Sequence, residues 1–356
     1  MTVTIDLDDL KDDITVIFHQ IVANKIKRGD KGRALFLYKN TNLTGDYAIN
    51  TYKSAVITLE DAALEKYIKQ IMKRGAKSVT VLEYKSTVAS VKDVMDDNLP
   101  NFDWIMSVDS DAQSAIATYA KENKKFACVY NIQADSIYVV SVINPSAVLI
   151  NDNGTTSTIT GLQLVPIIGG ACCGCPYNRS ISSYVFDELK SVTQPETYVL
   201  GQITLYPEEE GIRIANPVNT LQTLDTTHTE DMKSLTIAEG MYRLDNDIVK
   251  AFRTGYKGKY KNHYDNQCLF YAACNYGYLN ELESTGIEIL DPNYDNKIYT
   301  DVEAQRNAWL ATGKSEAADW SDDEVRKNTY KKSIYATLDV KFLDAMEAMK
   351  VTVEMF

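Results

Sequence analysis

The feature that most constrains the fold is a regular alternation of strand-like and helix-like segments between residues 34 and 131. Four short apolar runs of strand length occur, at 34–38, 79–82, 104–108 and 126–130. Helical patterns separate them, the first opened by Thr58 with Asp61 as capping-box partner, then at 88–98 and 110–123. Strands that alternate with helices in this way predict a parallel sheet covered by helices on both faces.

After residue 132 the pattern changes from α/β to α+β. Strands are expected at 136–150 and 202–215, the latter a hairpin that turns through 208–211, with an apolar segment of small residues at 162–175 between them. Further on we expect a strand at 235–237, a helix at 246–253 and a long helix at 264–283. The apolar stripe of that long helix is interpreted as core packing. The residues of the stripe are Leu269, Ala272, Ala273, Tyr276 and Leu279.

Both ends of the chain alternate apolar and polar residues with the period of a β-strand. The apolar positions are Val3, Ile5 and Leu7 at the start, and Val351, Val353 and Met355 at the finish. Two interpretations fit this pattern. Each end is an edge strand of its own subunit, which the pattern alone favours, or each leaves the body and adds a strand to a neighbouring copy.

Composition excludes several classes of protein. The 356 residues are 45% hydrophobic and 24% charged, as in folded proteins, which excludes a disordered tail, a collagen-like chain and a disulfide miniprotein. A net charge of −12 argues against broad binding to nucleic acid or anionic membrane. No signal segment or membrane-spanning run is apparent, so the six cysteines are expected to be reduced thiols of a protein made in the cytosol.

Motifs that would carry chemistry are missing from the sequence. The three histidines, His19, His228 and His263, lack the spacing of a metal site, and the cluster of Cys172, Cys173 and Cys175 lacks a fourth ligand. Small buried thiols in a tight helix are the preferred interpretation of that cluster. No complete phosphate loop and no nucleophile elbow occur. We therefore expect no catalytic residue, no metal and no cofactor.

One basic run needs an explanation in so acidic a chain. Tyr256 and Tyr260 are interleaved with four cations, Arg253, Lys257, Lys259 and Lys261. Aromatic and basic residues together are typical of nucleic-acid binding. A solvated loop or a patch that faces another protein is favoured here because of the overall negative charge.

Several stretches, in order, resemble the tail sheath proteins of contractile phage tails and of phage-tail-like R-type bacteriocins. The resemblance covers most of the chain from about residue 14 onward. It rests on the order and spacing of the stretches more than on any single motif. They are 14–18 with 27–32, 167–170 through 176–180, 211–214 with 218–221, 255–259 with Asn262, and 278–282.

The resemblance implies a central α/β domain of the subtilisin-like type, followed by an α+β sheath domain. The implied boundaries are 1–20 for an N-terminal arm, 21–225 for the α/β domain, 226–345 for the C-terminal domain and 346–356 for a C-terminal arm. The subtilisin-like domain would be catalytically dead, because the region from 33 to 205 contains no histidine to act as the general base.

The resemblance also implies a mechanical function rather than an enzymatic one. Copies would polymerise as stacked rings around an inner tube and contract to drive it through a target cell envelope. The implied partners are the same chain, the tube protein, and baseplate and tail terminator proteins, with no nucleic acid and no membrane insertion. Assembly would take place in the bacterial cytoplasm, and the product would be part of a released phage tail or tail-like particle.

Within this family the two alternating ends are favoured as arms that join neighbouring subunits. An acidic tube would also require a basic inner surface on the sheath. The candidates are Lys257, Lys259, Lys261, Arg326, Lys327, Lys331 and Lys332. The alternatives left open are an αβ-fold hydrolase-like enzyme and an extracellular lattice protein.

Overall fold

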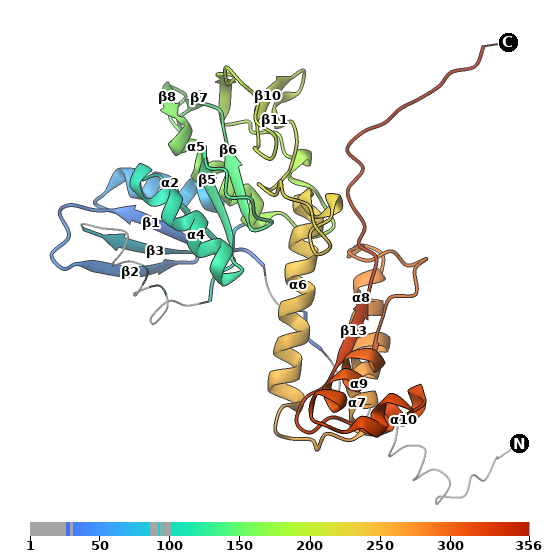
Figure 1. Ribbon diagram of the computed structural model, residues 1–356. Coiled ribbons are helices and arrows are strands. Elements are labelled where there is room, and N and C mark those ends of the chain that lie inside the picture. The colour runs from blue at the N-terminus through green and yellow to red at the C-terminus, as the bar shows by residue number, and fades with distance from the viewer. Residues whose placement is uncertain (1–25, 29–30, 86–91, 93–94, 96–100, 356) are drawn as a thin grey trace, which may run out of the picture. The chain divides into compact units, whose positions relative to one another are not determined.

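The computed structural model describes residues 26–28, 31–85, 92, 95 and 101–355 (Figure 1). The chain divides into two compact units. We call Asp30–Glu239 with Asp344–Phe356 the sheet unit, and Met1–Gly29 with Gly240–Leu343 the helical unit. No helix in the described part is long and apolar enough to cross a bilayer.

The sheet unit is built on a six-stranded sheet of order β2-β3-β1-β4-β5-β6. All neighbouring strands run parallel except β2, which is antiparallel to β3 at one edge. The expected parallel sheet is therefore present, with one edge strand that the sequence pattern did not indicate. The strands are β1 (Arg33–Lys39), β2 (Tyr47–Tyr52), β3 (Ser78–Tyr84), β4 (Trp104–Ser107), β5 (Phe126–Tyr130) and β6 (Val139–Val142).

Helices cover both faces of this sheet, as expected. Helix α4 (Gln113–Asn123) buries Ile116 and Ala120 against the face that carries Leu35 and Ile105. Helices α2 (Ala62–Met72) and α5 (Gly161–Gly174) pack against each other and cover the opposite face. Successive strand residues point to opposite faces, so the nearly continuous apolar strands serve both helical layers.

The first helix begins later than the sequence pattern predicted. Asp61, not Thr58, is its N-cap, and the Asp61 carboxylate accepts hydrogen bonds from the backbone N–H groups of Ala63 and Leu64. An aspartate that can satisfy two free N–H groups is a good N-cap, so it competes well with a threonine three residues earlier.

Helix α5 explains the apolar small-residue segment. Gly170 lies so close to α2 that an added Cβ would be 2.6 Å from the backbone of Ile71. Cys172 and Cys173 are fully buried in this helix, and burial raises the pKa of the Cys172 thiol well above its usual value. The interpretation of these cysteines as small buried thiols agrees with their place in the core.

The remaining strands of the sheet unit form two small antiparallel sheets. One is three-stranded with the order β8-β7-β9, and the other is the expected hairpin of β10 and β11. The strands are β7 (Ser146–Ile150), β8 (Thr156–Thr160), β9 (Leu189–Val192), β10 (Leu205–Glu208) and β11 (Gly211–Ile214).

The helical unit begins inside α6 (Leu235–Ala251), because the chain passes from one unit to the other between Glu239 and Gly240. The predicted strand at 235–237 is wrong, since these residues are the first turn of α6. A short apolar run does not distinguish a strand from a buried helical turn. The expected helix at 246–253 is the end of α6 and the π-helical segment Phe252–Tyr256 that follows it.

The long helix expected at 264–283 is present as α7 (Tyr264–Ala272), a π-helical segment (Ala273–Leu279) and α8 (Asn280–Glu283). Of its predicted stripe, Ala273 and Leu279 are buried, Leu269 and Ala272 are partly buried, and Tyr276 is 80% exposed. The π-helical turn there shifts the helical period and rotates that side chain out of the stripe. The unit also contains α9 (Val302–Ala311), α10 (Asp322–Lys327) and an antiparallel pair, β12 (Lys297–Thr300) and β13 (Ala336–Asp339).

Candidate functional site

Two basic segments of the helical unit lie side by side. The first segment, Lys257 to Asn262, joins the π-helical turn after α6 to α7, which begins at its N-cap His263. The second segment, Arg326 to Ser333, continues from the end of α10. We call the two together the basic surface. The sequence offered them as separate candidates for a surface that faces the tube.

Asn262 holds the two segments together. Its side-chain amide nitrogen is 3.2 Å from the carbonyl oxygens of Tyr330 and Lys331 and 3.1 Å from that of Ser333. The Thr329 hydroxyl donates a hydrogen bond of 2.8 Å to the backbone carbonyl of Asn262. The segments are thus joined across 67 to 71 residues of sequence.

Most cations of the basic surface are exposed to solvent. Within the described residues no carboxylate lies within 4.0 Å of the ammonium groups of Lys257, Lys261, Lys327 or Lys332. Arg326, in contrast, is paired with Asp323 at 2.7 Å. The arrangement concentrates positive charge, which attracts negatively charged groups.

The two remaining cations make contacts with residues close to them in sequence. The Lys259 ammonium donates a hydrogen bond of 2.5 Å to the carbonyl of Thr254, and the Lys331 ammonium lies 5.2 Å from the centre of the Tyr330 ring. Sequence reasoning singled out all of these cations but did not show that they share a surface. Asn262 was noticed only as part of a motif, because its hydrogen-bond partners are distant in sequence.

The C-terminal arm candidates are exposed. Val351, Val353 and Met355 are 67%, 76% and 91% exposed and belong to no helix or strand (Figure 1). The segment before them is attached within the sheet unit, where the Ser234 hydroxyl donates to Asp344 at 2.9 Å and the Ser182 hydroxyl to Glu347 at 3.2 Å. The N-terminal candidates Val3, Ile5 and Leu7 lie outside the described residues.

The β12–β13 pair has one closed edge and one open edge. On the β12 side, the Asn275 amide both accepts a hydrogen bond from the N–H of Ile298 and donates one to its carbonyl. Ile298 is paired with Leu338, so in an antiparallel ladder the backbone groups of Leu338 point away from β12. Among the described residues these groups have no hydrogen-bond partner.

A family relationship is detectable for the C-terminal part of the chain. The family described as phage tail sheath C-terminal domain matches residues 227–356. Residues 227–356 are therefore similar to a tail sheath C-terminal domain. This range contains the basic surface, the open edge of β13 and the C-terminal arm candidates. No protein with a curated description matches the chain in sequence.

Solved sheath structures share the fold of most of the chain. The anti-feeding prophage helical sheath in its contracted state is 12% identical, with a TM-score of 0.65 over 93% of this chain and 95% of that chain. A sheath tail protein from Desulfitobacterium hafniense is 15% identical, with a TM-score of 0.60 over 78% and 91%. The contracted sheath of the extracellular contractile injection system PVC is 9% identical, with a TM-score of 0.62 over 93% and 94%.

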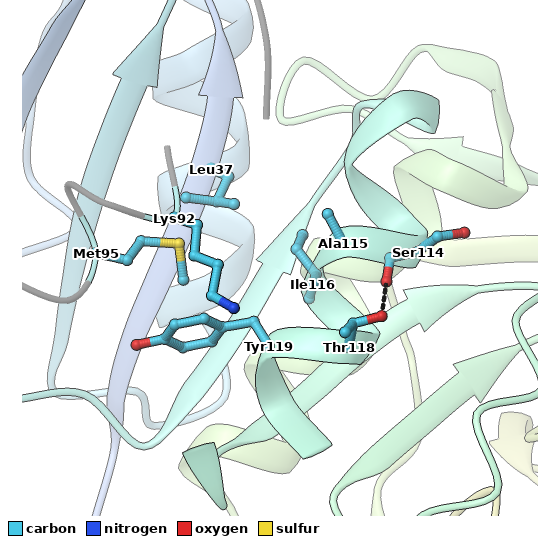
Figure 2. A pocket seen from close by; sticks show the side chains of 8 residues that line it. All are labelled: Leu37, Lys92, Met95, Ser114, Ala115, Ile116, Thr118 and Tyr119. Atoms are coloured by element: carbon cyan, nitrogen blue, oxygen red, sulfur yellow. Dashed lines mark hydrogen bonds between the residues drawn. The ribbon is translucent and has the colours of Figure 1, made fainter. Parts of the chain in front are cut away.

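This sheath fold also contains a pocket of about 380 Å³ between α4 and the β-sheet (Figure 2). Among the described lining residues, the only charged side chain is that of Lys92. The Thr118 hydroxyl donates a hydrogen bond of 3.0 Å to the backbone carbonyl of Ser114. The eight described lining residues include no histidine, cysteine or carboxylate. They are Leu37, Lys92, Met95, Ser114, Ala115, Ile116, Thr118 and Tyr119.

Metal ligands are likewise not grouped in the described residues, which contain no cluster of three or more His, Cys, Asp or Glu side chains able to hold an ion. The Nδ1 atom of His228 lies 3.0 Å from a carboxylate oxygen of Asp225, within hydrogen-bond distance, and His263 is the N-cap of α7. Both histidines therefore have structural explanations within their own turns.

Proposed function

We propose that the chain is a structural subunit of a contractile tail sheath, which polymerises around an inner tube and contracts to drive that tube through a cell envelope. The observation that carries this proposal is the match of residues 227–356 to the sheath C-terminal domain. Agreement of the fold with a contracted helical sheath over 93% of the chain supports it. Contraction requires two packings of one fold that differ in interface energy.

The α/β part is proposed to be a subtilisin-like scaffold without catalysis, with boundaries at 21–225 for this domain and 226–345 for the C-terminal one. The absence of any histidine between residues 33 and 205 supports this role, because a serine there would have no general base. The subunit is accordingly proposed not to be an enzyme.

The two ends, 1–20 and 346–356, are proposed to be arms that add strands to neighbouring copies. The exposed apolar residues Val351, Val353 and Met355 support this, since a partner would bury them. The open edge of β13 at Leu338 offers backbone groups that an incoming strand could satisfy. Contacts of this head-to-tail kind generate open helical assemblies.

The basic surface is proposed to face an acidic inner tube, with baseplate and tail terminator proteins as further partners at the ends of the sheath. The concentration of unpaired lysines on one surface of an acidic chain supports the tube assignment. Assembly is proposed to take place in the bacterial cytoplasm, before release as part of a phage tail or tail-like particle.

The test is electron microscopy of the purified chain, alone and with the tube protein encoded beside it. The proposal expects hollow striated cylinders, shorter and wider after contraction. A flat lattice would instead favour the extracellular lattice alternative, and hydrolysis of substrates in an activity screen would favour the hydrolase-like alternative. A monomer that never assembles with either its tube or its baseplate proteins would overturn the proposal.

A further inference from the structure

We propose that Asn262 is a positioning residue that makes the two basic segments one recognition surface for an acidic protein. The inference deepens the proposed function, because the identification of the acidic partner as the tube protein rests on that function. The joining of the two segments rests on the geometry of the helical unit alone.

The first step is that Asn262 adds hydrogen bonds to the one that the second segment makes itself, in which the N–H of Ser333 donates to the carbonyl of Tyr330 at 3.0 Å. Its amide nitrogen faces the carbonyls of Tyr330, Lys331 and Ser333. The orientation of that amide is set from the other side, because Gln267 donates to its oxygen at 2.7 Å and is itself 1% exposed. The turn of the second segment is therefore held by a side chain anchored in the core through α7.

The second step is that this turn is strained. Lys331 has a φ of +43°, in the left-handed region that a lysine rarely adopts. Such a conformation costs on the order of 1 kcal/mol and persists only where its surroundings determine it. The Asn262 amide contacts the carbonyls of Lys331, of Tyr330 before it and of Ser333 two residues after it. It therefore stabilises the conformation that presents Lys331 and Lys332 to solvent.

The third step concerns the class of partner. Single-stranded nucleic acid would need aromatic rings on which bases stack. Tyr256 is only 7% exposed and packs edge-on against Phe270, with ring centres 4.9 Å apart, which leaves only Tyr260 of the interleaved pair at the surface. Exposed lysines beside only one exposed ring of that pair favour an acidic protein surface over single-stranded nucleic acid.

The experiment compares Asn262→Ala with the matched control Asn266→Ala in the full-length chain. Asn266 donates at 2.9 Å to the carbonyl of Lys261 and so bonds only within the first segment. The probe is poly-L-glutamate, with single-stranded DNA as the competing polyanion, titrated at several salt concentrations. We expect Asn262→Ala to weaken the binding of poly-L-glutamate roughly fivefold or more and to increase amide hydrogen exchange at 329–333, whereas Asn266→Ala changes neither.

A second comparison covers the case in which Asn262→Ala fails to fold. Lys257→Gln and Lys332→Gln remove one cation from each segment and leave the hydrogen bonds from Asn262 in place. If the two segments form a single surface, each substitution should weaken the same binding of poly-L-glutamate. Four outcomes would each overturn the inference. The two segments could show independent binding events, or folded Asn262→Ala could keep the wild-type affinity. The wild type could also bind DNA more tightly than poly-L-glutamate, or not bind poly-L-glutamate at all. Because every titration uses the unassembled chain, failure to form a sheath would contradict the proposed function without changing this result.

Discussion

The ammonium group of Lys31 lies 2.5 Å from a carboxylate oxygen of Glu239, and both side chains are about nine-tenths buried. The second oxygen of Glu239 accepts a hydrogen bond of 3.1 Å from the indole of Trp104. Burial raises the pKa of the Glu239 carboxyl, and the facing lysine opposes that shift. Glu239 is the last residue of the sheet unit in α6, so the pair ties the start of that helix to the segment that enters β1.

Removing one partner of this pair should be far more damaging than removing both charges. Glu239→Ala leaves Lys31 buried without a carboxylate and is expected to lower the free energy of unfolding by about 3 kcal/mol or more. The double variant Lys31→Met with Glu239→Gln keeps an acceptor for Trp104 and should lie within about 1 kcal/mol of the wild type. Urea unfolding measures both, and equal losses in the single and double variants would contradict the prediction.

Asp135 should make the sheet unit sensitive to acid. Hydrogen bonds from the side chain and N–H of Thr223, and then from the N–H of Gln222, lower the pKa of its carboxyl to about 2. Its contribution to stability is therefore present above the unfolded-state pKa of about 4 and is lost as the pH falls toward 2.

The matching variant is Asp135→Asn, which tolerates the left-handed φ of +48° at this position. We expect its unfolding free energy to change less between pH 4 and pH 2 than that of the wild type, as followed by urea unfolding at each pH. If the unfolding free energy of both proteins changed equally between pH 4 and pH 2, this carboxyl would be ruled out as a source of the acid sensitivity.

Gly170 should tolerate no larger side chain, because α5 and α2 approach most closely there. Gly170→Ala is expected to lower the unfolding free energy by about 1–3 kcal/mol, since a Cβ at 2.6 Å from the Ile71 backbone forces the helices apart. Gly255→Ala is the control, because a Cβ there has nothing within 4 Å. Thermal unfolding compares the two variants. An unchanged unfolding temperature in Gly170→Ala would show that the helices separate without loss of stability.

The C-terminal arm should matter for assembly and not for folding. Val351→Asp with Val353→Asp places charges on the exposed apolar side of the arm. The urea midpoint should stay at the wild-type value because both side chains are already exposed, and cylinders should no longer form in electron micrographs. Thr352→Ala, on the polar side, is the matched control. Normal cylinders from the double variant would exclude strand addition by this segment.

The sequence alone determined the elements whose patterns are local. The apolar runs of β1, β3, β4 and β5, and helices α2 and α4, follow from hydrophobic periodicity over a few residues, and their alternation is sufficient to predict a parallel sheet. Local patterns were insufficient for β2, a half-exposed edge strand, and for residues 235–237, whose apolar run fits a strand and a helical turn equally well.

Only the tertiary structure decided which distant residues meet. The sequence placed Lys257 and Lys332 in unrelated segments, and the amide of Asn262 joins those two segments in the structure. The pairing of Lys31 with Glu239 and the open edge of β13 also depend on residues that are distant in sequence. Periodicity reports which side of its own element a residue occupies, whereas a hydrogen bond or ion pair between elements depends on how the whole chain closes upon itself.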